Sequence, residues 1–231
     1  MLCPKIPVVA VARQAMTGVA NPFGFFDAIF CLNLDRESRR WREATLRYQT
    51  LGIAAQVERF PAILTPDNHH RGCALSWRQM IAEASRRDYT HLLVFEDDAV
   101  FLDDTPAVVG VAVAELAIQE WDLCYLGAAV WAQQFPFVNG STVLQECGPV
   151  TCTHALAVHR RAFARLLADI PPDGVTFDAW LSRWVAIDQY LSSAIYDGRF
   201  RVLITSPRVA TQRELLTRDD TDGLFAGRYR I

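Results

Sequence analysis

The sequence predicts a single α/β domain in which a mostly parallel, twisted sheet is flanked by helices. Two observations predict this class. Short, nearly unbroken apolar runs, such as Ala28–Leu34 and His91–Phe95, are typical of strands that are covered on both faces. Segments with helical apolar spacing separate these runs, and strands that alternate with helices favour a parallel sheet. The length of 231 residues fits one domain of this kind.

The composition argues against several classes of protein. The formal net charge is −3 and no basic stripe is visible, so nucleic acid is not an expected partner. No apolar run reaches the roughly 18 residues of a membrane span, so no transmembrane segment is expected. The six cysteines are scattered without a Cys-x-x-Cys pair, which favours reduced thiols in a cytoplasmic protein.

The first half of the chain shows regular alternation after an unpatterned start. Residues 1–27 lack apolar periodicity, which predicts an irregular N-terminal extension. Asp35 could cap a helix in which Trp41 and Leu51 share the apolar face, and Gly52 suits its end. The later elements expected in this half are a strand at 53–60, a helix that opens at Gly72 and runs to 87, the strand at 91–95 and a helix from Thr105 and Pro106 to about 119.

The second half continues the same alternation. The pair Asn139 and Gly140 predicts a tight turn inside a loop-rich segment. The charged tail at 213–231 is expected to be mobile, which leaves 28–212 as the folded domain. The elements expected in this half are strands at 122–126 and 151–158, a helix at 160–168, one long helix at 178–196 after a break at 171–174, and a last strand at 200–205.

Three carboxylates, Glu96, Asp97 and Asp98, directly follow the apolar strand at 91–95. In open α/β sheets ligands bind outside the carboxyl ends of the strands, so this position favours a functional role. If strand geometry continues, Glu96 and Asp98 point to one side and Asp97 to the other. Two carboxylates that face one way favour a cation between them, and oxygen ligands suit Mg²⁺ or Mn²⁺. The alternative is a solvated acidic turn that caps the next helix.

Asp188 lies within the apolar stripe of the helix expected at 178–196. A carboxylate is out of place in such a stripe, and burial would suit it to accept a proton from a substrate. The alternative is a structural aspartate tied to a backbone or arginine donor, and the pattern alone favours that alternative.

Other polar positions near the expected sheet edge carry weaker signals. His154 lies in a strand, where a hydrogen-bonded core histidine is commoner than a ligand. The segment from Asn33 to Arg36 ends the first strand, where arginine and a helix N-terminus can bind phosphate. The glycine-rich dinucleotide and phosphate-loop motifs and the Gly-x-Ser-x-Gly elbow are absent from the sequence.

The order of these segments resembles that of glycosyltransferase family 25, the lipopolysaccharide-type sugar transferases that also include collagen galactosyltransferases. The resemblance covers roughly residues 28–212. No single segment is specific, but eight of them follow the order of the family. They are IFCLNLDRESRRW (29–41), RFPAI (59–63), GCALSW (72–77), HLLVFEDDAVF (91–101), WDLCYLG (121–127), THALAVHRRAF (153–163), DQYL (188–191) and SPRVATQ (206–212).

The resemblance implies a GT-A-like fold and inverting transfer of a hexose, galactose or glucose, from a UDP-sugar donor with Mn²⁺ or Mg²⁺. It implies Asp98 as the main metal ligand and Glu96 as its companion. It implies Asp188 as the catalytic base.

The same resemblance implies a set of residues that bind the nucleotide-sugar. These are Asn33, Arg36, Asp97, His154 and Gln212. The family usually has Ser-His where this chain has Ser76 and Trp77, so the usual acceptor or sugar contact differs here. The tryptophan face could stack on a sugar ring or fill the core.

We therefore expect an enzyme that glycosylates a glycan or lipid-linked glycan, as in lipopolysaccharide biosynthesis. The expected location is the cytoplasm, and a lipid-linked acceptor would bring the protein to the inner membrane. Two alternatives come from other classes. One is a catalytically degenerate GT-A domain that binds a nucleotide or glycan, and the other is a metal-dependent phosphohydrolase.

Overall fold

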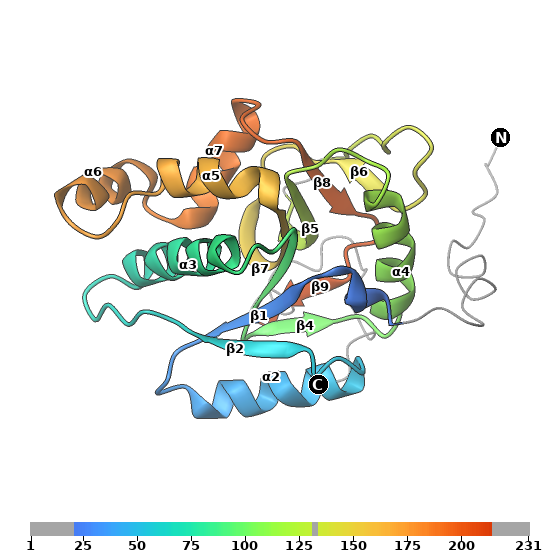
Figure 1. Cartoon of the computed structure of the whole chain (residues 1–231), viewed down its shortest axis with the longest axis horizontal. Helices are drawn as coiled ribbons and strands as arrows, with labels where there is room; N and C mark the ends of the chain where they lie inside the picture. The colour runs from blue at the N-terminus through green and yellow to red at the C-terminus, as the bar shows by residue number, and fades with distance from the viewer. Residues whose placement is uncertain (1–20, 131–133, 214–231) are drawn as a thin grey trace.

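The computed structural model describes residues 21–130 and 134–213, which are built around a seven-stranded sheet of order β2-β1-β3-β7-β5-β8-β6 (Figure 1). Strands β2, β1, β3, β5 and β8 run in one direction, and β7 and β6 run in the other. The predicted α/β class with a mostly parallel sheet is therefore confirmed. The strands are β1 (Ala28–Asn33), β2 (Val57–Pro61), β3 (His91–Glu96), β5 (Leu123–Ala129), β6 (Leu144–Glu146), β7 (Thr151–His159) and β8 (Val202–Thr205).

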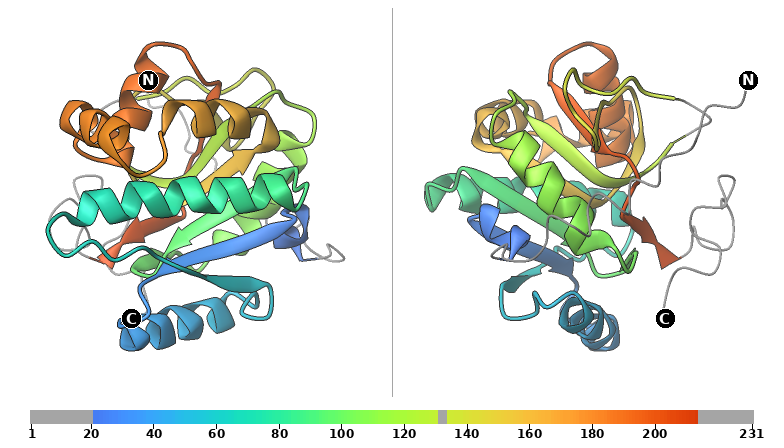
Figure 2. Two further views of the ribbon diagram at one scale, coloured as in Figure 1. Left: turned by 60° about the vertical axis from the view of Figure 1, so that its left-hand side comes forward. Right: turned by 90° about the vertical axis from the view of Figure 1, so that its right-hand side faces the viewer.

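Helices cover both faces of this sheet. One face carries α3, α5, α6 and α7, and Figure 2 (left) shows α3 beside the other three. The opposite face carries η1, α2 and α4. The helices are η1 (Pro22–Phe25), α2 (Ser38–Thr50), α3 (His69–Arg86), α4 (Thr105–Leu116), α5 (Arg160–Asp169), α6 (Val175–Trp184) and α7 (Ile187–Tyr196).

The apolar runs of the strands explain the two layers. Successive side chains of a strand point to opposite faces, so an unbroken apolar run supplies two cores at once. In β1, Phe30 and Leu32 pack under α3, whereas Ile29 and Cys31 pack on the side of α2. The strands predicted from such runs accordingly lie in the middle of the sheet, not at its edges.

Two predicted boundaries shift in the structure. Residues 21–27, which the sequence assigned to an irregular extension, belong to the folded domain, because η1 buries Phe23 against the sheet. Residues 1–20 and the predicted tail from 214 lie outside the described residues. Helix α3 begins at His69, before Gly72, because the side chain of Asn68 caps it by accepting the backbone N–H groups of its first turn. Gly72 serves packing instead, since a Cβ there would overlap the carbonyl of Ile63.

The prediction of one long helix over 178–196 is wrong. The chain breaks into α6 and α7 at Val185, whose φ of 64° lies in a region that β-branched residues rarely adopt. The N–H of Ala186 donates to the carbonyl of Trp184 over 2.7 Å, so a γ-turn joins the two helices. A break of two residues hardly disturbs apolar spacing, which is why the pattern did not reveal it.

A second, two-stranded sheet lies beside the end of β3. It pairs β4 (Ala99–Phe101) antiparallel with β9 (Ala210–Gln212). The sequence predicted neither strand, because each has only three residues. The pairing brings the last described strand next to the acidic segment that follows β3. Among the helices of the described part, none is both long and apolar enough to cross a membrane.

Candidate active site

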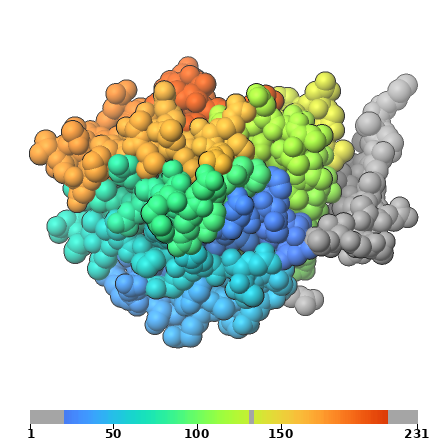
Figure 3. All heavy atoms as spheres, in the orientation of Figure 1, coloured from blue at the N-terminus to red at the C-terminus, as the bar shows by residue number. Residues whose placement is uncertain are grey.

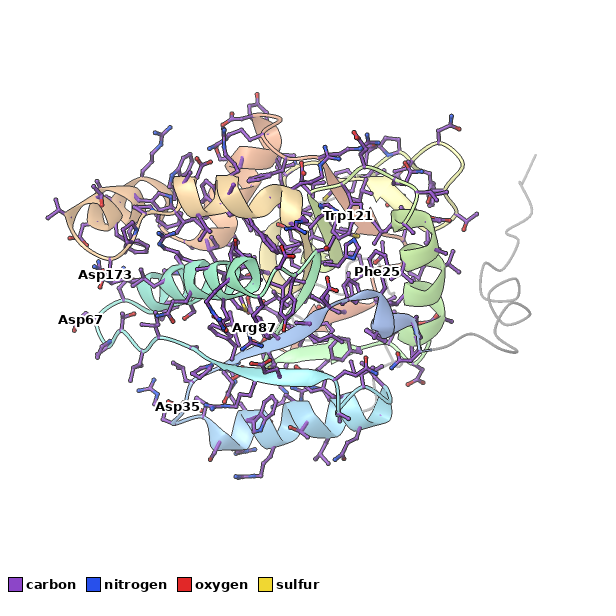
Figure 4. The ribbon with its side chains drawn as sticks, viewed as in Figure 1. Phe25, Asp35, Asp67, Arg87, Trp121 and Asp173 are labelled. Carbon is purple, nitrogen blue, oxygen red and sulfur yellow. The ribbon has the colours of Figure 1, made fainter. Side chains whose placement is uncertain are left out.

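The acidic segment lies at the edge of the sheet where the parallel strands end. The loops that follow β1, β2 and α5 reach the same end of the molecule, as Asp35, Asp67 and Asp173 show in Figure 4. Because β7 is antiparallel to β3, its first residues also lie at this edge. Polar groups from distant segments therefore meet here, as the position of the motif predicted.

Asp97 is the most enclosed of the three carboxylates, with 7% of its surface exposed. The side-chain amide of Asn33 donates to its Oδ2 over 2.7 Å, and the guanidinium of Arg40 lies 2.7 Å from its Oδ1. The guanidinium of Arg47 donates to its backbone carbonyl over 2.6 Å. Burial raises the pKa of Asp97, and the contacts with Asn33 and Arg40 oppose that effect. These contacts give Asp97 a structural role that ties β3 to β1 and α2.

Glu96 faces a different set of partners. The hydroxyl of Thr153 in β7 donates to its Oε1 over 2.6 Å, and the amide of Gln212 in β9 donates to its Oε2 over 3.1 Å. Burial, followed by the negative charge of Asp98, raises the pKa of Glu96 to about 7, and the charge of Asp188 adds to this. The carboxylates of β3 and α7 are therefore within electrostatic reach of one another.

Asp98 continues the chain toward β4. The guanidinium of Arg40 lies 3.2 Å from its Oδ2, so one arginine contacts both Asp97 and Asp98. Strand geometry therefore does not continue past Glu96: Asp97 and Asp98 lie in a turn and do not alternate between two sides. The backbone N–H of Arg213 donates to its carbonyl over 3.2 Å. The side chain of Arg40 is 45% exposed, so this cation borders solvent at the edge of the sheet.

Asp188 lies in the first turn of α7, half-buried. Its Oδ2 accepts the backbone N–H of Cys152 over 3.1 Å, and its Oδ1 accepts the N–H of Gln189 over 2.9 Å. Each carboxylate oxygen retains a second lone pair for another donor. Cys152 (φ 69°) and Val185 (φ 64°) both have positive φ, which strains a backbone with a side chain. Strained residues on both sides of one carboxylate are typical of functional sites.

An open cleft of about 750 Å³ begins at Asp188. Its walls come from α7, from the turn between α6 and α7, and from His70 at the start of α3. Helix α6 forms the outermost part of this end of the molecule (Figure 3). The cleft has the volume of a small-molecule site, for which roughly 300–1,000 Å³ is usual.

The structure separates the predicted site residues into two groups. The first group converges on the edge of the sheet and consists of Glu96, Asp98, Asn33, Asp97 and Gln212. Asp188 belongs with this group, because it accepts the N–H of Cys152, the neighbour of the Thr153 that contacts Glu96.

The second group lies elsewhere. Arg36 is exposed and pairs with its neighbour Glu37. His154 is fully buried, with Nε2 3.3 Å from the carbonyl of Ala210. Ser76 and Trp77 are buried inside α3, and Trp77 is 2% exposed. Neither face of that indole is open to a sugar ring, so Trp77 fills the core and we leave both residues out of the acceptor site.

Several residues of the site escaped the sequence analysis. Arg40 lies on the helix after the first strand, and helical spacing alone does not show which residues of other segments a side chain contacts. Thr153 carries no motif of its own. Trp184 and Tyr196 line the cleft, which the prediction of one continuous helix over 178–196 did not reveal.

The donor set at the sheet edge fits one type of metal site. Within residues 21–130 and 134–213, no three His, Cys, Asp or Glu side chains form a preassembled metal cluster. Mg²⁺ is usually held by one or two carboxylates together with substrate phosphates, not by an all-protein cage. Glu96 and Asp98 are hard oxygen donors whose charges already interact, and they suit a shared site of that type.

No family model matches this chain, and no curated protein matches it. Several solved structures are similar in shape, and two of them are transferases. The first is a glycosyltransferase involved in the glycosylation of the major capsid of PBCV-1, with 12% identity, a TM-score of 0.48, and coverage of 77% of this chain and 79% of that chain. The second is mannose-1-phosphate geranyltransferase from Thermus thermophilus, with 14% identity, a TM-score of 0.37, and coverage of 77% and 72%.

Proposed function

We propose that this protein is a metal-dependent, inverting glycosyltransferase of GT-A-like fold. It transfers a hexose from a UDP-sugar to a hydroxyl of a glycan or lipopolysaccharide-type acceptor. One observation carries the proposal: adjacent residues of β7 hold both carboxylates at the carboxyl edge of the sheet. The hydroxyl of Thr153 donates to Glu96, and the N–H of Cys152 donates to Asp188, which lines the open cleft. The ordered resemblance to glycosyltransferase family 25 supplies the reaction class.

The edge of the sheet forms the donor side. Glu96 and Asp98 would hold Mn²⁺ or Mg²⁺, which when bound neutralises charge on the departing nucleoside diphosphate. Thr153 and Gln212 keep the Glu96 carboxylate in place. Asn33 and Asp97 form the adjoining wall, where the nucleotide would lie.

Asp188 acts as the base on the acceptor side. The N–H groups of Cys152 and Gln189 fix its orientation and leave a lone pair on each oxygen. The proton of the acceptor hydroxyl passes to Asp188 as the hydroxyl oxygen forms a bond to the anomeric carbon. The bond from that carbon to the UDP oxygen breaks, and UDP leaves with the electron pair from the opposite face.

Thermal unfolding with UDP, GDP, CMP or ADP, each with and without Mn²⁺, tests the donor site. A ligand at 100 times its Kd adds about 2.7 kcal/mol of stability, which is readily measured. We expect a Mn²⁺-dependent shift with UDP that is lost in Asp98→Asn. Asp103→Asn is the matched control, because Asp103 is an exposed aspartate a few residues along the chain.

The same preparation should release UDP from a UDP-hexose when acceptor glycans are supplied. A nucleotide shift without any turnover would favour the degenerate binding domain. Release of inorganic phosphate from simple phosphate esters would favour the phosphohydrolase. An equal shift in wild type and Asp98→Asn would refute the metal assignment.

A further inference from the structure

The cleft beside Asp188 is lined by more side chains than the removal of one proton requires. Its wall includes Trp184 and Tyr196, and Tyr196 is 81% exposed. Between these aromatic residues lie the polar side chains of Gln189, Ser192 and Ser193. An aromatic side chain in a cleft that also carries hydroxyl and amide groups suits a ligand with apolar faces and many hydroxyls. Sugar rings have this character.

The direction of α7 extends that surface away from the base. Asp188, Ser192 and Tyr196 are spaced four residues apart, so they lie along one face of the helix. Eight residues of α-helix span about 12 Å. The cleft therefore accommodates more than the single sugar that receives the hexose, and Tyr196 lies where a second ring would reach.

Arg183 adds a positive charge to this cleft. Its guanidinium lies 4.5 Å from the centroid of the Trp184 ring, and it lines the cleft beside that residue. Within the described part of the chain no carboxylate forms an ion pair with it. The nearby Asp169 is already engaged, since Arg165 and Arg199 lie 3.1 Å and 3.2 Å from its Oδ2. A guanidinium held on an aromatic face is well placed to bind a carboxylate or phosphate.

We propose that the acceptor is an acidic saccharide, that Tyr196 packs against one of its rings, and that Arg183, held on the ring of Trp184, pairs with its anionic group. The inference rests on the proposed transferase function, because it assigns the acceptor to the cleft where Asp188 is the base. The anion is a carboxylate or a phosphate, which present the same charge and oxygen acceptors to the arginine.

A glycan array that carries neutral, carboxylated and phosphorylated oligosaccharides tests the proposal by binding alone. Wild type should bind acidic glycans in preference to neutral ones, and the bound class distinguishes carboxylate from phosphate. Arg183→Gln should weaken that binding about tenfold or more, because a hydrogen bond to a charged group is lost. Tyr196→Ala should weaken it, whereas Tyr196→Phe should restore it. Arg86→Gln is the control, because Arg86 is an exposed arginine at the far end of α3.

Equal binding of neutral and acidic glycans would overturn the proposal. Unaltered binding by Arg183→Gln, or an array on which no glycan binds, would overturn it as well. The thermal shift of wild type with UDP and Mn²⁺, measured in parallel, reports on the transferase function separately. Glycan binding without that shift would support the saccharide site and refute the donor site. The shift without glycan binding would support the donor site and refute the saccharide site.

Discussion

His154 is expected to make the protein sensitive to mild acid. Its imidazole is fully buried in β7, where Nε2–H donates to the carbonyl of Ala210, and Nδ1 has no hydrogen-bond partner in the described part of the chain. Protonation would place a second N–H and a positive charge in that core without an acceptor. Burial lowers the pKa of His154 from 6.5 to about 4, and the positive charge of Arg208 contributes in the same direction.

The sign of the effect follows from proton uptake. Below pH 6.5 the unfolded chain binds a proton at His154 that the folded chain does not bind. Stability is therefore complete above pH 6.5 and is lost as the pH falls toward 4. The two pKa values imply a loss of about 2.5 kcal/mol between pH 7.5 and pH 4.5.

Urea denaturation of wild type and His154→Gln at pH 7.5, 6.0, 5.0 and 4.5 measures this loss. The amide of glutamine can still donate to Ala210 but does not titrate, so all other acid effects cancel in the difference. We expect wild type to lose about 2.5 kcal/mol more than the variant. An NMR titration of the wild-type ring gives the pKa independently of the variant. Parallel pH profiles together with a ring that titrates near 6.5 would refute the reasoning.

Three further substitutions, one of them with a control variant, test other parts of the structure. Asp188→Asn should lower kcat by about 10²–10⁴ in a UDP-release assay, and full activity would exclude Asp188 as the base. Gly127→Ala should destabilise the protein by about 1–3 kcal/mol in urea, because its Cβ would overlap the carbonyl of Ala210. Gly24→Ala, with open space around it, should change stability by less than about 0.5 kcal/mol, and equal effects would contradict the packing argument. Val185→Gly should raise thermal stability, by about 1 kcal/mol, because glycine adopts a φ of 64° without strain, and a loss would show that Val185 is not strained.

The elements of the central sheet were predictable because burial on both faces leaves a strong signal. The runs at β1 and β3 contain almost no polar residues, and the helices between them keep apolar spacing. The strands β4 and β9 were not predictable, since three residues are too few to show a period. The break at Val185 was missed because the apolar residues before and after it keep a helical spacing in the sequence.

The candidate site was predictable only in part, for a related reason. Chain position identified Glu96, Asp97 and Asp98, because polar residues after a buried strand fall at the ligand-binding edge. The contacts of Glu96 with Thr153 and Gln212 depend on which strands become neighbours, and no local pattern contains that information.

The hydrogen bonds that hold the acidic segment in place join residues that are far apart in the sequence. Asn33 and Asp97 are 64 residues apart in the chain, Glu96 and Thr153 are 57 apart, and Glu96 and Gln212 are 116 apart. Closing loops of this length costs conformational entropy that contacts between neighbours do not. The contact of Gln212 with Glu96 exists only when β9 lies beside the segment, so the segment is complete only in the fully folded chain. Ligand binding there would select fully folded molecules over partly folded ones, and would stabilise only the former.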